Sequence, residues 1–316
     1  MEKHKLLVIV GPTAVGKTAL SLVLAKQFDG EIVSGDSMQV YRGMDIGTAK
    51  VSRAERQEVP HHLIDIVDPD YPFSVAEFQA RAKQAIEDIA SRGRLPILVG
   101  GTGLYIQSVT HGYQFSEAEA DEKIRARWRK YAEQHGRRAL HDALKRVDPE
   151  SADRLHPNDV RRMIRALEIV ERTGKTMTEI HREQKRESPY DIVWIGLTME
   201  RGVLYERINQ RVDQMVEQGM VEEVRKLKQK GYTLDLVSMQ GLGYKEIMMA
   251  LEGVWSLEEA VYHIKRNTRR FAKRQLSWFR RISEICWWDM TNEAERGKKV
   301  EDISHFVAGK LTGRAE

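Results

Sequence analysis

One segment constrains the fold of this chain more than any other: Gly11-Pro12-Thr13-Ala14-Val15-Gly16-Lys17-Thr18. It fits the pattern G-x-x-x-x-G-K-[ST], in which backbone N–H groups and the N-terminus of the following helix bind phosphate. The pattern requires a buried strand before it and a helix after it. Residues 6–10 form a continuous apolar run, and residues 18–28 carry apolar side chains at helical spacing, so both are predicted. We expect the segment to bind phosphate, with Lys17 as a point charge and Thr18 as a ligand of Mg²⁺.

Predicted strands and helices alternate over the first hundred residues. Short apolar runs predict strands at residues 6–10, 31–33, 63–67 and 95–99. Residues 74–91 are predicted to be helical, with Ser74 as the N-cap and Glu77 completing a capping box. Strands that alternate with helices favour an α/β fold in which helices flank a doubly wound parallel sheet, as in P-loop NTPases.

A helical block interrupts this alternation near Gly112. Residues 121–187 carry more basic than acidic side chains and no convincing strand pattern. Strands return only at residues 190–197 and 285–288. Helices are predicted at residues 122–135, 139–147, 159–173, 201–218, 221–230, 245–251 and 256–281. We therefore expect an α/β core formed by residues 1–113 and 189–316, and an inserted all-helical domain formed by residues 114–188.

The composition is that of a globular protein without a membrane span. The 316 residues are 41% apolar and 31% charged, and no apolar run approaches the length of about eighteen residues that a membrane helix needs. The apolar stretch near the N-terminus is too short for a secretory signal, so we expect a cytoplasmic protein. The single cysteine, Cys286, excludes an internal disulfide and cysteine-based zinc sites. A net charge of +4 is too small to indicate a nucleic-acid partner by itself.

Polar residues follow three of the predicted strands, at the sheet edge where ligands of such folds bind. Asp36 follows the second strand, and two interpretations are open: its carboxylate meets an acceptor nucleophile beside the phosphate, or it caps a turn. Asp68 follows the third strand and resembles the metal-holding aspartate of an NTPase, but Pro69 favours a turn. Gly100-Gly101-Thr102-Gly103 follows the next strand and fits either a ligand contact or a tight strand-to-helix turn.

Two basic segments have the character of nucleic-acid-binding surfaces. Residues 260–283 contain eight Lys or Arg and no acid, whereas a solvated helix face usually mixes both signs. The aromatic side chains between them fit either a core or a stacking surface for bases, and their helical spacing favours the core. In the second segment, Arg161 and Arg165 lie one helical turn apart on one face.

Seven segments together resemble those of the bacterial tRNA dimethylallyltransferase family. They are residues 11–18, 34–50, 61–65, 99–105, 156–159, 165–168 and 273–278. The longest reads S-G-D-S-M-Q-V-Y-R-G-M-D-I-G-T-A-K and starts at Ser34. The resemblance extends over residues 6–288, which is nearly the whole chain.

The resemblance implies transfer of a dimethylallyl group from dimethylallyl diphosphate to the exocyclic amine of the adenosine 3′ to the anticodon in tRNA. It implies that the diphosphate is held by Gly11, Pro12, Thr13, Ala14, Val15, Gly16, Lys17 and Thr18, with Mg²⁺ on Thr18. It also implies catalytic roles for Thr13, for Arg211, and for Asp36 as the general base. Because Arg207 lies one helical turn from Arg211, either arginine is a candidate diphosphate ligand.

The same resemblance implies that the helical insertion contacts the anticodon arm of tRNA. The implied tRNA-contacting residues are Asp36, Ser37, Met38, Gln39, Thr102, Arg125, Arg161, Arg162, Met163, Ile164 and Arg165. We expect a monomer with no membrane partner.

Two other functions remain open on the residues alone. A kinase for a small molecule or nucleoside would use the same phosphate loop, with Asp36 receiving a hydroxyl proton, because the loop pattern specifies phosphate rather than ATP. A nucleic-acid-stimulated ATPase would use the loop and the basic segments without transfer chemistry. Turnover of ATP separates both from a prenyl transferase, which needs no γ-phosphate.

Overall fold

Two compact units make up the chain: residues 1–111 together with residues 188–316, and residues 112–187. The computed structural model describes residues 3–113, 115, 121–184 and 187–312. The domain boundaries expected from the sequence, after residues 113 and 188, lie within two residues of the boundaries between these units. Residue 114, the first of the expected insertion, lies outside the described residues.

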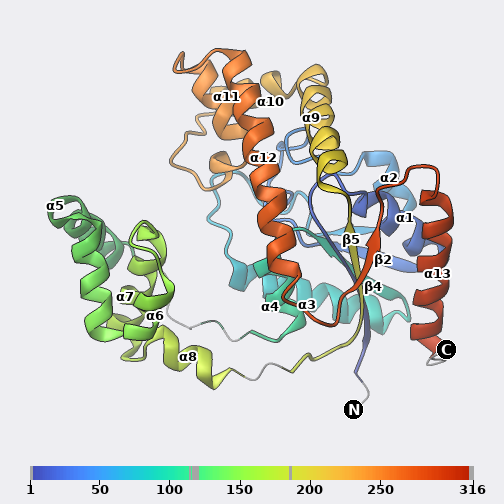
Figure 1. The fold of residues 1–316 in the computed structure, drawn as a ribbon, viewed down its shortest axis with the longest axis horizontal. Helices are drawn as coiled ribbons and strands as arrows, with labels where there is room; N and C mark the ends of the chain where they lie inside the picture. The colour runs from blue at the N-terminus through green and yellow to red at the C-terminus, as the bar shows by residue number, and fades with distance from the viewer. Residues whose placement is uncertain (1–2, 114, 116–120, 185–186, 313–316) are drawn as a thin grey trace. The chain divides into compact units, whose positions relative to one another are not determined.

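The α/β unit is built on a six-stranded parallel sheet with the strand order β3-β2-β4-β1-β5-β6 (Figure 1). The strands are β1 (Lys5–Val10), β2 (Gly30–Ser34), β3 (His61–His62), β4 (Leu95–Gly100), β5 (Asp191–Thr198) and β6 (Cys286–Asp289). The predicted parallel α/β fold is confirmed. Because parallel strands end at the same edge of the sheet, the loops after β1, β2 and β4 lie close together there.

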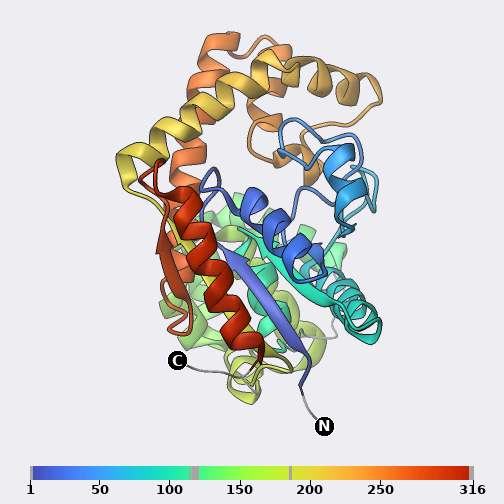
Figure 2. The same ribbon diagram turned by 90° about the vertical axis from the view of Figure 1, so that its right-hand side faces the viewer.

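Helices cover both faces of the sheet. Along β1, Leu6, Val8 and Val10 pack with residues of α3 and α4, whereas Leu7 and Ile9 pack with residues of α1 and α13. Figure 2 views the sheet from the side that carries α1 (blue) and α13 (red). The helices of this unit are α1 (Lys17–Gln27), α2 (Arg53–Glu58), α3 (Val75–Ser91), α4 (Gly103–Thr110), α9 (Arg201–Glu217), α10 (Met220–Gln229), α11 (Tyr244–Leu251), α12 (Leu257–Phe279) and α13 (Arg296–Thr312).

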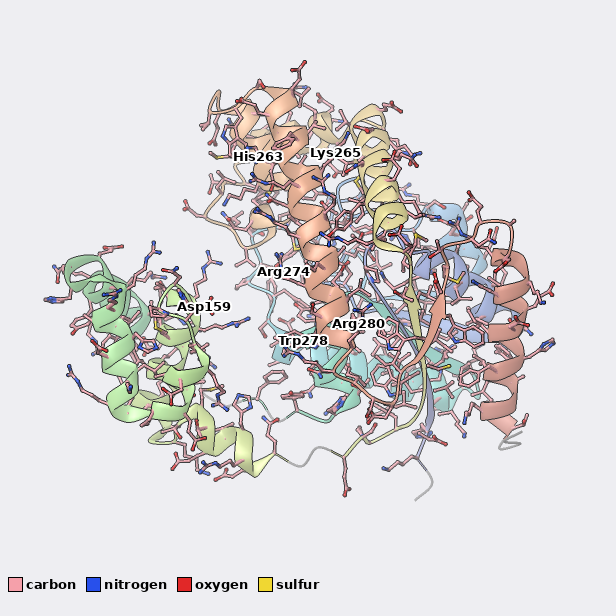
Figure 3. All side chains as sticks on the ribbon, viewed as in Figure 1. Asp159, His263, Lys265, Arg274, Trp278 and Arg280 are labelled. Atoms are coloured by element: carbon pink, nitrogen blue, oxygen red, sulfur yellow. The ribbon has the colours of Figure 1, made fainter. Side chains whose placement is uncertain are left out.

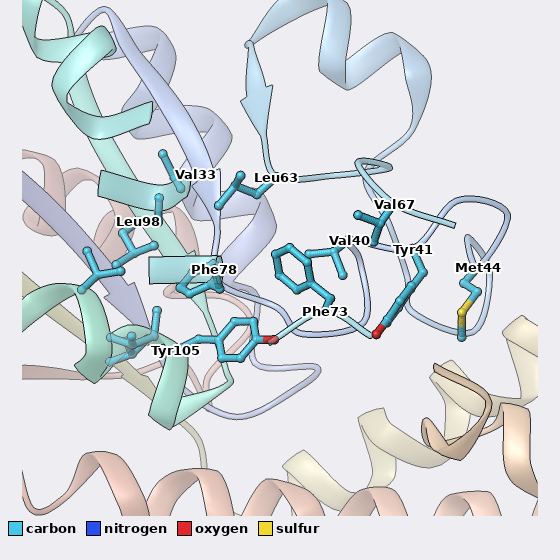
Figure 4. Close-up of a cluster of buried hydrophobic side chains, with 14 of the residues drawn as sticks. Val33, Val40, Tyr41, Met44, Leu63, Val67, Phe73, Phe78, Leu98 and Tyr105 are labelled. Carbon is cyan, nitrogen blue, oxygen red and sulfur yellow. The ribbon is translucent and has the colours of Figure 1, made fainter. Parts of the chain in front are cut away.

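The strand predicted at residues 63–67 is wrong. The strand β3 ends at His62, and the next residues turn, with positive φ at Leu63 (63°) and Asp65 (57°). Leu63 and Val67 are both buried in the hydrophobic cluster that includes Tyr41 and Phe73 (Figure 4), and neither lies in one of the six strands. Apolar periodicity reports burial, so in a short run it does not distinguish a strand from a buried loop.

The second unit is all-helical, as the sequence predicts. Its helices are α5 (Glu122–Val147), α6 (Pro149–Arg154), α7 (Val160–Thr173) and α8 (Met177–Glu183). Gly136, at φ 86° and ψ 162°, kinks α5 between the two helices predicted at residues 122–135 and 139–147. A small core of buried side chains from α5, α6 and α7 holds the unit together; it includes Leu140, Leu144, Met163 and Leu167.

Candidate active site

The phosphate-binding segment forms a loop between β1 and α1. Gly11 has φ +146°, and a Cβ there would lie 2.5 Å from the carbonyl oxygen of Leu197. Gly16, at φ +109°, is the N-cap of α1 in a left-handed conformation that favours glycine. These two glycines let the loop curl over the N-terminus of α1, where free N–H groups and the helix dipole favour an anion.

Lys17 lies inside this loop. Its Nζ donates to the carbonyl oxygens of Gly11 (2.9 Å) and Pro12 (2.7 Å). Burial, together with the nearby Arg211, lowers the pKa of Lys17 to about 7, although Asp36 acts in the opposite direction. A cation that is desolvated and close to a second cation is stabilised by an anion, which is what a phosphate ligand supplies.

Both interpretations of Asp36 that the sequence leaves open, a turn cap and a carboxylate beside the phosphate, are compatible with its surroundings. Its Oδ1 accepts a hydrogen bond from the backbone N–H of Met38 (2.8 Å), so it does cap a turn. The turn uses only that one oxygen; among the described residues, Oδ2 has no hydrogen-bond partner. Because the same carboxylate acts on the pKa of both Lys17 and Arg211, it lies beside the phosphate loop. The turn therefore orients the carboxylate and leaves one oxygen for a ligand.

Arg207 and Arg211 have different surroundings although both come from α9. The Nε of Arg207 donates to the carbonyl oxygen of Ala14 in the phosphate loop (3.1 Å). Arg211 has no hydrogen bond to any residue that the structure describes. Burial lowers the pKa of Arg211, Asp36 raises it, and Arg207 lowers it. We infer that Arg207 supports the loop backbone, while the guanidinium of Arg211 is available to a ligand.

Two adjoining cavities share these residues. The larger, of about 1110 Å³, is lined by the phosphate loop, Asp36, Arg207 and Arg211. The smaller, of about 390 Å³, shares Thr13, Asp36 and Arg211 with it. Its other walls include the apolar side chains of Ile208, Val212, Met215, Ile264 and Phe271. A polar space, lined near Asp36 by Lys17 and Arg211, therefore adjoins a mainly apolar one, and Asp36 lines both.

The buried side chain of Gln275 on α12 was not singled out by the sequence analysis. Its Oε1 accepts from the backbone N–H of Thr13 (2.9 Å), and its Nε2 donates to the carbonyl oxygen of Gly101 (3.0 Å). A Cβ at residue 101 would lie 2.1 Å from that Nε2. The glycine after β4 is therefore explained by the close approach of Gln275, in addition to the turn that the sequence suggests.

The described residues provide few metal ligands. No group of three or more His, Cys, Asp or Glu that could hold a metal lies among them. Thr18, in the first turn of α1, is exposed and lines the larger cavity. Asp68 instead pairs with Arg42 (3.2 Å), and its carbonyl oxygen accepts from the N–H of Tyr71, so the turn favoured by Pro69 is confirmed.

The basic helix α12 exposes only part of its charge. Arg270, Lys273 and Arg274 are exposed, and so are Arg280 and Arg281 just beyond the helix. Figure 3 labels Lys265, Arg274, Trp278 and Arg280 along this stretch. Lys265, however, pairs with Asp213 of α9 at 2.6 Å. The number of unpaired cations in residues 260–283 is therefore at least one lower than the sequence of this segment suggests.

The predicted tRNA-contacting residues of α7 divide into two groups. Arg161 and Arg162 are exposed. Met163 and Ile164 have relative exposures of 0% and 5% and pack in the core of the helical unit. The side chains of Met163 and Ile164 are therefore not presented at the surface, so the predicted contact of these two residues with tRNA would have to use their backbone groups. In an amphipathic helix, consecutive residues point in different directions, so a continuous five-residue segment cannot present all its side chains to one ligand.

Arg125 and Arg165 converge on a buried carboxylate. Glu168 is 0% exposed and accepts from Arg125 through Nε (2.9 Å) and Nη2 (3.1 Å), and from Arg165 at 2.7 Å. Burial would raise the pKa of Glu168, but these hydrogen bonds outweigh it and hold the pKa below the ordinary value. The ion pairs thus tie the start of α5 to α7 and keep both arginines at the surface of the unit.

We expect Glu168→Gln to destabilise the helical unit by about 3 kcal/mol, because it leaves two arginines without their anion. Amide hydrogen exchange of α7 measures the change. The control is Glu171→Gln, which removes a partly exposed partner of Arg127 on the same helix and should change stability by less than about 1 kcal/mol. Equal effects of the two substitutions would contradict a special role for the Glu168 cluster.

No helix within the described part of the chain is long and apolar enough to cross a membrane.

Comparisons with known proteins give consistent matches over the whole chain. The IPP transferase family matches residues 39–282, and the isopentenyl transferase family matches residues 4–69. A curated tRNA dimethylallyltransferase of Halalkalibacterium halodurans is 54% identical over 315 residues, which are 99% of this chain and 100% of that protein. Another, from Geobacillus thermodenitrificans, is 55% identical over 98% of each chain.

Solved structures with related sequences have the same fold. The crystal structure of the full-length tRNA isopentenylpyrophosphate transferase from Bacillus halodurans has 52% identity and a TM-score of 0.75, covering 99% of this chain and 98% of that one. A eukaryotic dimethylallyltransferase described as acting on tRNA has 32% identity and a TM-score of 0.85, covering 99% of this chain and 80% of that one.

Proposed function

The chain belongs to the tRNA dimethylallyltransferase family, and on that premise we propose that it transfers a dimethylallyl group from dimethylallyl diphosphate to the exocyclic amine of the adenosine 3′ to the anticodon of tRNA. One observation carries the assignment to this site. Asp36 lines both the polar cavity that contains Lys17 and Arg211 and the adjoining, mainly apolar cavity, so one place offers a base, a diphosphate site and a hydrocarbon site.

In the proposed reaction, a bond forms between the exocyclic nitrogen and C1 of the dimethylallyl group, while the bond from C1 to the diphosphate oxygen breaks. The electron pair of the broken bond leaves with the diphosphate. One amine proton passes to the free oxygen of Asp36. Bond formation makes the amine strongly acidic, so a carboxylate can accept its proton.

Lys17, Arg211 and the N–H groups at the start of α1 would stabilise the charge that develops on the leaving diphosphate. They surround the cavity before the reaction, so they need little reorganisation when that charge appears. We assign Arg211, rather than Arg207, as the arginine that contacts the diphosphate, because Arg207 already binds the loop backbone. Thr13 lies in the loop and lines both cavities, in keeping with its predicted role at the reacting end of the donor.

The residues present fit a Mg²⁺ ion held in the manner common for phosphate substrates. In phosphate loops of this pattern the Ser or Thr hydroxyl is one ligand of Mg²⁺, and substrate phosphates and water supply others, so the exposed Thr18 hydroxyl would be one ligand here. A bound Mg²⁺ would neutralise part of the diphosphate charge. Lys17 and Arg211 supply the remaining positive charge from the protein.

The apolar walls of the smaller cavity would bind the five-carbon group and exclude water from the reacting carbon. The target adenosine would have to leave its stack to reach Asp36. We propose that Ser37, Met38, Gln39 and Thr102 meet this base, and that Arg125, Arg161, Arg162 and Arg165 meet the anticodon arm. We also propose, as expected from the sequence, that the enzyme acts as a monomer in the cytoplasm.

The proposal is tested by incubating the protein with unmodified tRNA, Mg²⁺ and radiolabelled dimethylallyl diphosphate. We expect label to enter tRNA at the adenosine 3′ to the anticodon, in parallel with release of diphosphate. Radiolabelled ATP serves as the alternative donor. Transfer or hydrolysis of its γ-phosphate, without incorporation of the dimethylallyl label, would favour a kinase or an ATPase instead.

We expect binding of the donor to be coupled to protonation of Lys17. With a pKa of about 7, much of Lys17 is neutral at pH 8, and a bound diphosphate raises its pKa again. Binding of dimethylallyl diphosphate at pH 8 should therefore take up a proton. Calorimetric titrations in two buffers with different ionisation enthalpies measure this uptake directly.

Lys17→Ala should remove this proton uptake and weaken donor binding by at least about 30-fold, which corresponds to ~2 kcal/mol. Binding of tRNA should hardly change, because Lys17 lies inside the phosphate loop. If the folded Lys17→Ala protein loses tRNA affinity to the same extent, the anticodon arm lies closer to this loop than we propose.

A further inference from the structure

A continuous set of contacts joins the phosphate loop to the segment that holds Asp36, through the side chains of Gln275 and Thr102. Gln275 accepts from the N–H of Thr13 and donates to the carbonyl oxygen of Gly101. The residue after Gly101 is Thr102, whose Oγ1 accepts from the N–H of Ser37 (3.3 Å). Ser37 follows Asp36, whose Oδ1 is held by the N–H of Met38.

We propose that Gln275 is a positioning residue that sets the distance between the donor diphosphate and the Asp36 carboxylate. The inference rests on the proposed function, since it assumes that Thr13 belongs to the donor site and Asp36 to the acceptor site. The strand order supports it. Because β4 lies between β1 and β2, the loop after β4 is the natural bridge between the loops after β1 and β2.

The surroundings of Gln275 hold its side chain in one position between the loops after β1 and β4. The side chain is 6% exposed, and both ends of its amide are bonded to backbone groups, which do not change rotamer. Packing restricts it further, since a Cβ at Gly101 would meet its Nε2 at 2.1 Å. A buried amide with both ends satisfied transmits the position of one loop to the other.

Distance matters here because the reaction joins a carbon on one side to a nitrogen on the other. A displacement of about 1 Å between reacting groups can lower a rate about 100-fold without changing the affinity for either partner. Removal of the bridge should therefore slow the chemical step. It should leave the donor and tRNA dissociation constants close to their original values.

The first test compares Gln275→Met with Gln79→Met in single-turnover reactions. Methionine preserves side-chain length but makes neither hydrogen bond. Gln79 is also buried, on α3, and donates to the carbonyl oxygen of Ser108, so it controls for the loss of a buried amide away from the site. We expect Gln275→Met to lower the single-turnover rate about 100-fold and Gln79→Met to lower melting temperature alone. A rate for Gln275→Met within threefold of the original would overturn the inference.

The second test is a double-mutant cycle with Asp36→Asn. If Gln275 acts by placing Asp36 relative to the donor, Gln275→Met should slow the Asp36→Asn protein far less than it slows the original protein. A loss of the same size in both backgrounds would overturn the inference, because it would show that Gln275 acts independently of Asp36. If Gln275→Met does not fold, Gln275→Glu replaces it in the cycle, since it keeps the acceptor for Thr13 and loses only the donor to Gly101.

Different results would contradict the proposed function and the proposed role of Gln275. Absence of dimethylallyl transfer by the original protein contradicts the proposed function. The ratios between variants test the role of Gln275.

Discussion

Asp36→Asn should lower the rate of dimethylallyl transfer by about 10²–10⁴, the usual effect of losing a general base. Asparagine has nearly the same size and can still accept from the N–H of Met38, so the turn at the end of β2 should survive. It cannot take up the proton that leaves the amine. Single-turnover rates, with dissociation constants for donor and tRNA measured alongside, should show a slow chemical step and little change in binding.

Two control measurements separate this role from the alternatives. If Asp36 held the metal, raising the Mg²⁺ concentration should partly restore the rate of Asp36→Asn. If Asp36 served only as the cap of its turn, the substitution should lower the melting temperature and leave turnover per folded molecule nearly intact. Either result would replace the general-base assignment.

Binding of tRNA should weaken by about a thousandfold between 50 and 200 mM salt, if about six phosphate contacts form. The exposed cations expected to make them are Arg161, Arg270, Lys273, Arg274, Arg280 and Arg281. Each contact releases condensed counterions from the RNA, so the affinity falls as a power of the salt concentration. Filter binding or fluorescence titration across this range gives the slope. A flat dependence would mean that these side chains have a structural role only.

Matched variants on one helix make this prediction sharper. Arg270→Ala should reduce the salt slope by about one unit. Lys265→Ala should leave the slope close to its original value, because Lys265 is already paired with Asp213. Equal reductions for both variants would show that the pair opens when tRNA binds.

Local chemistry explains what was predictable from the sequence. The phosphate loop was predictable because its sequence pattern follows from backbone geometry. Glycine is favoured where the loop takes positive φ, and the N-terminus of the helix that follows favours an anion. The apolar runs of β1, β4 and β5 predicted a buried parallel sheet because a strand covered on both faces has no polar alternation. Asp36 was placed correctly at the sheet edge because it follows the apolar run that predicted β2.

The errors have one cause: a linear pattern does not say what a side chain meets. Residues 63–67 look like a strand because Leu63 and Val67 are buried, but the chain turns between them. Met163 and Ile164 stand between arginines in the sequence and point into the core in the fold. The cationic stretch of α12 contains no acid, yet Asp213 reaches Lys265 from another helix.

The phosphate loop, the parallel sheet, the helical insertion and the candidate base could all be predicted from the sequence, since each depends on residues close together in the chain. The distant groups that complete the site became visible only in the fold. Arg211, rather than Arg207, is left free by contacts within the fold. Gln275 reaches Thr13 across 262 residues, and no local pattern encodes that meeting. The physical reason is that periodicity specifies which face of an element is buried, whereas the packing of whole elements specifies what that face touches.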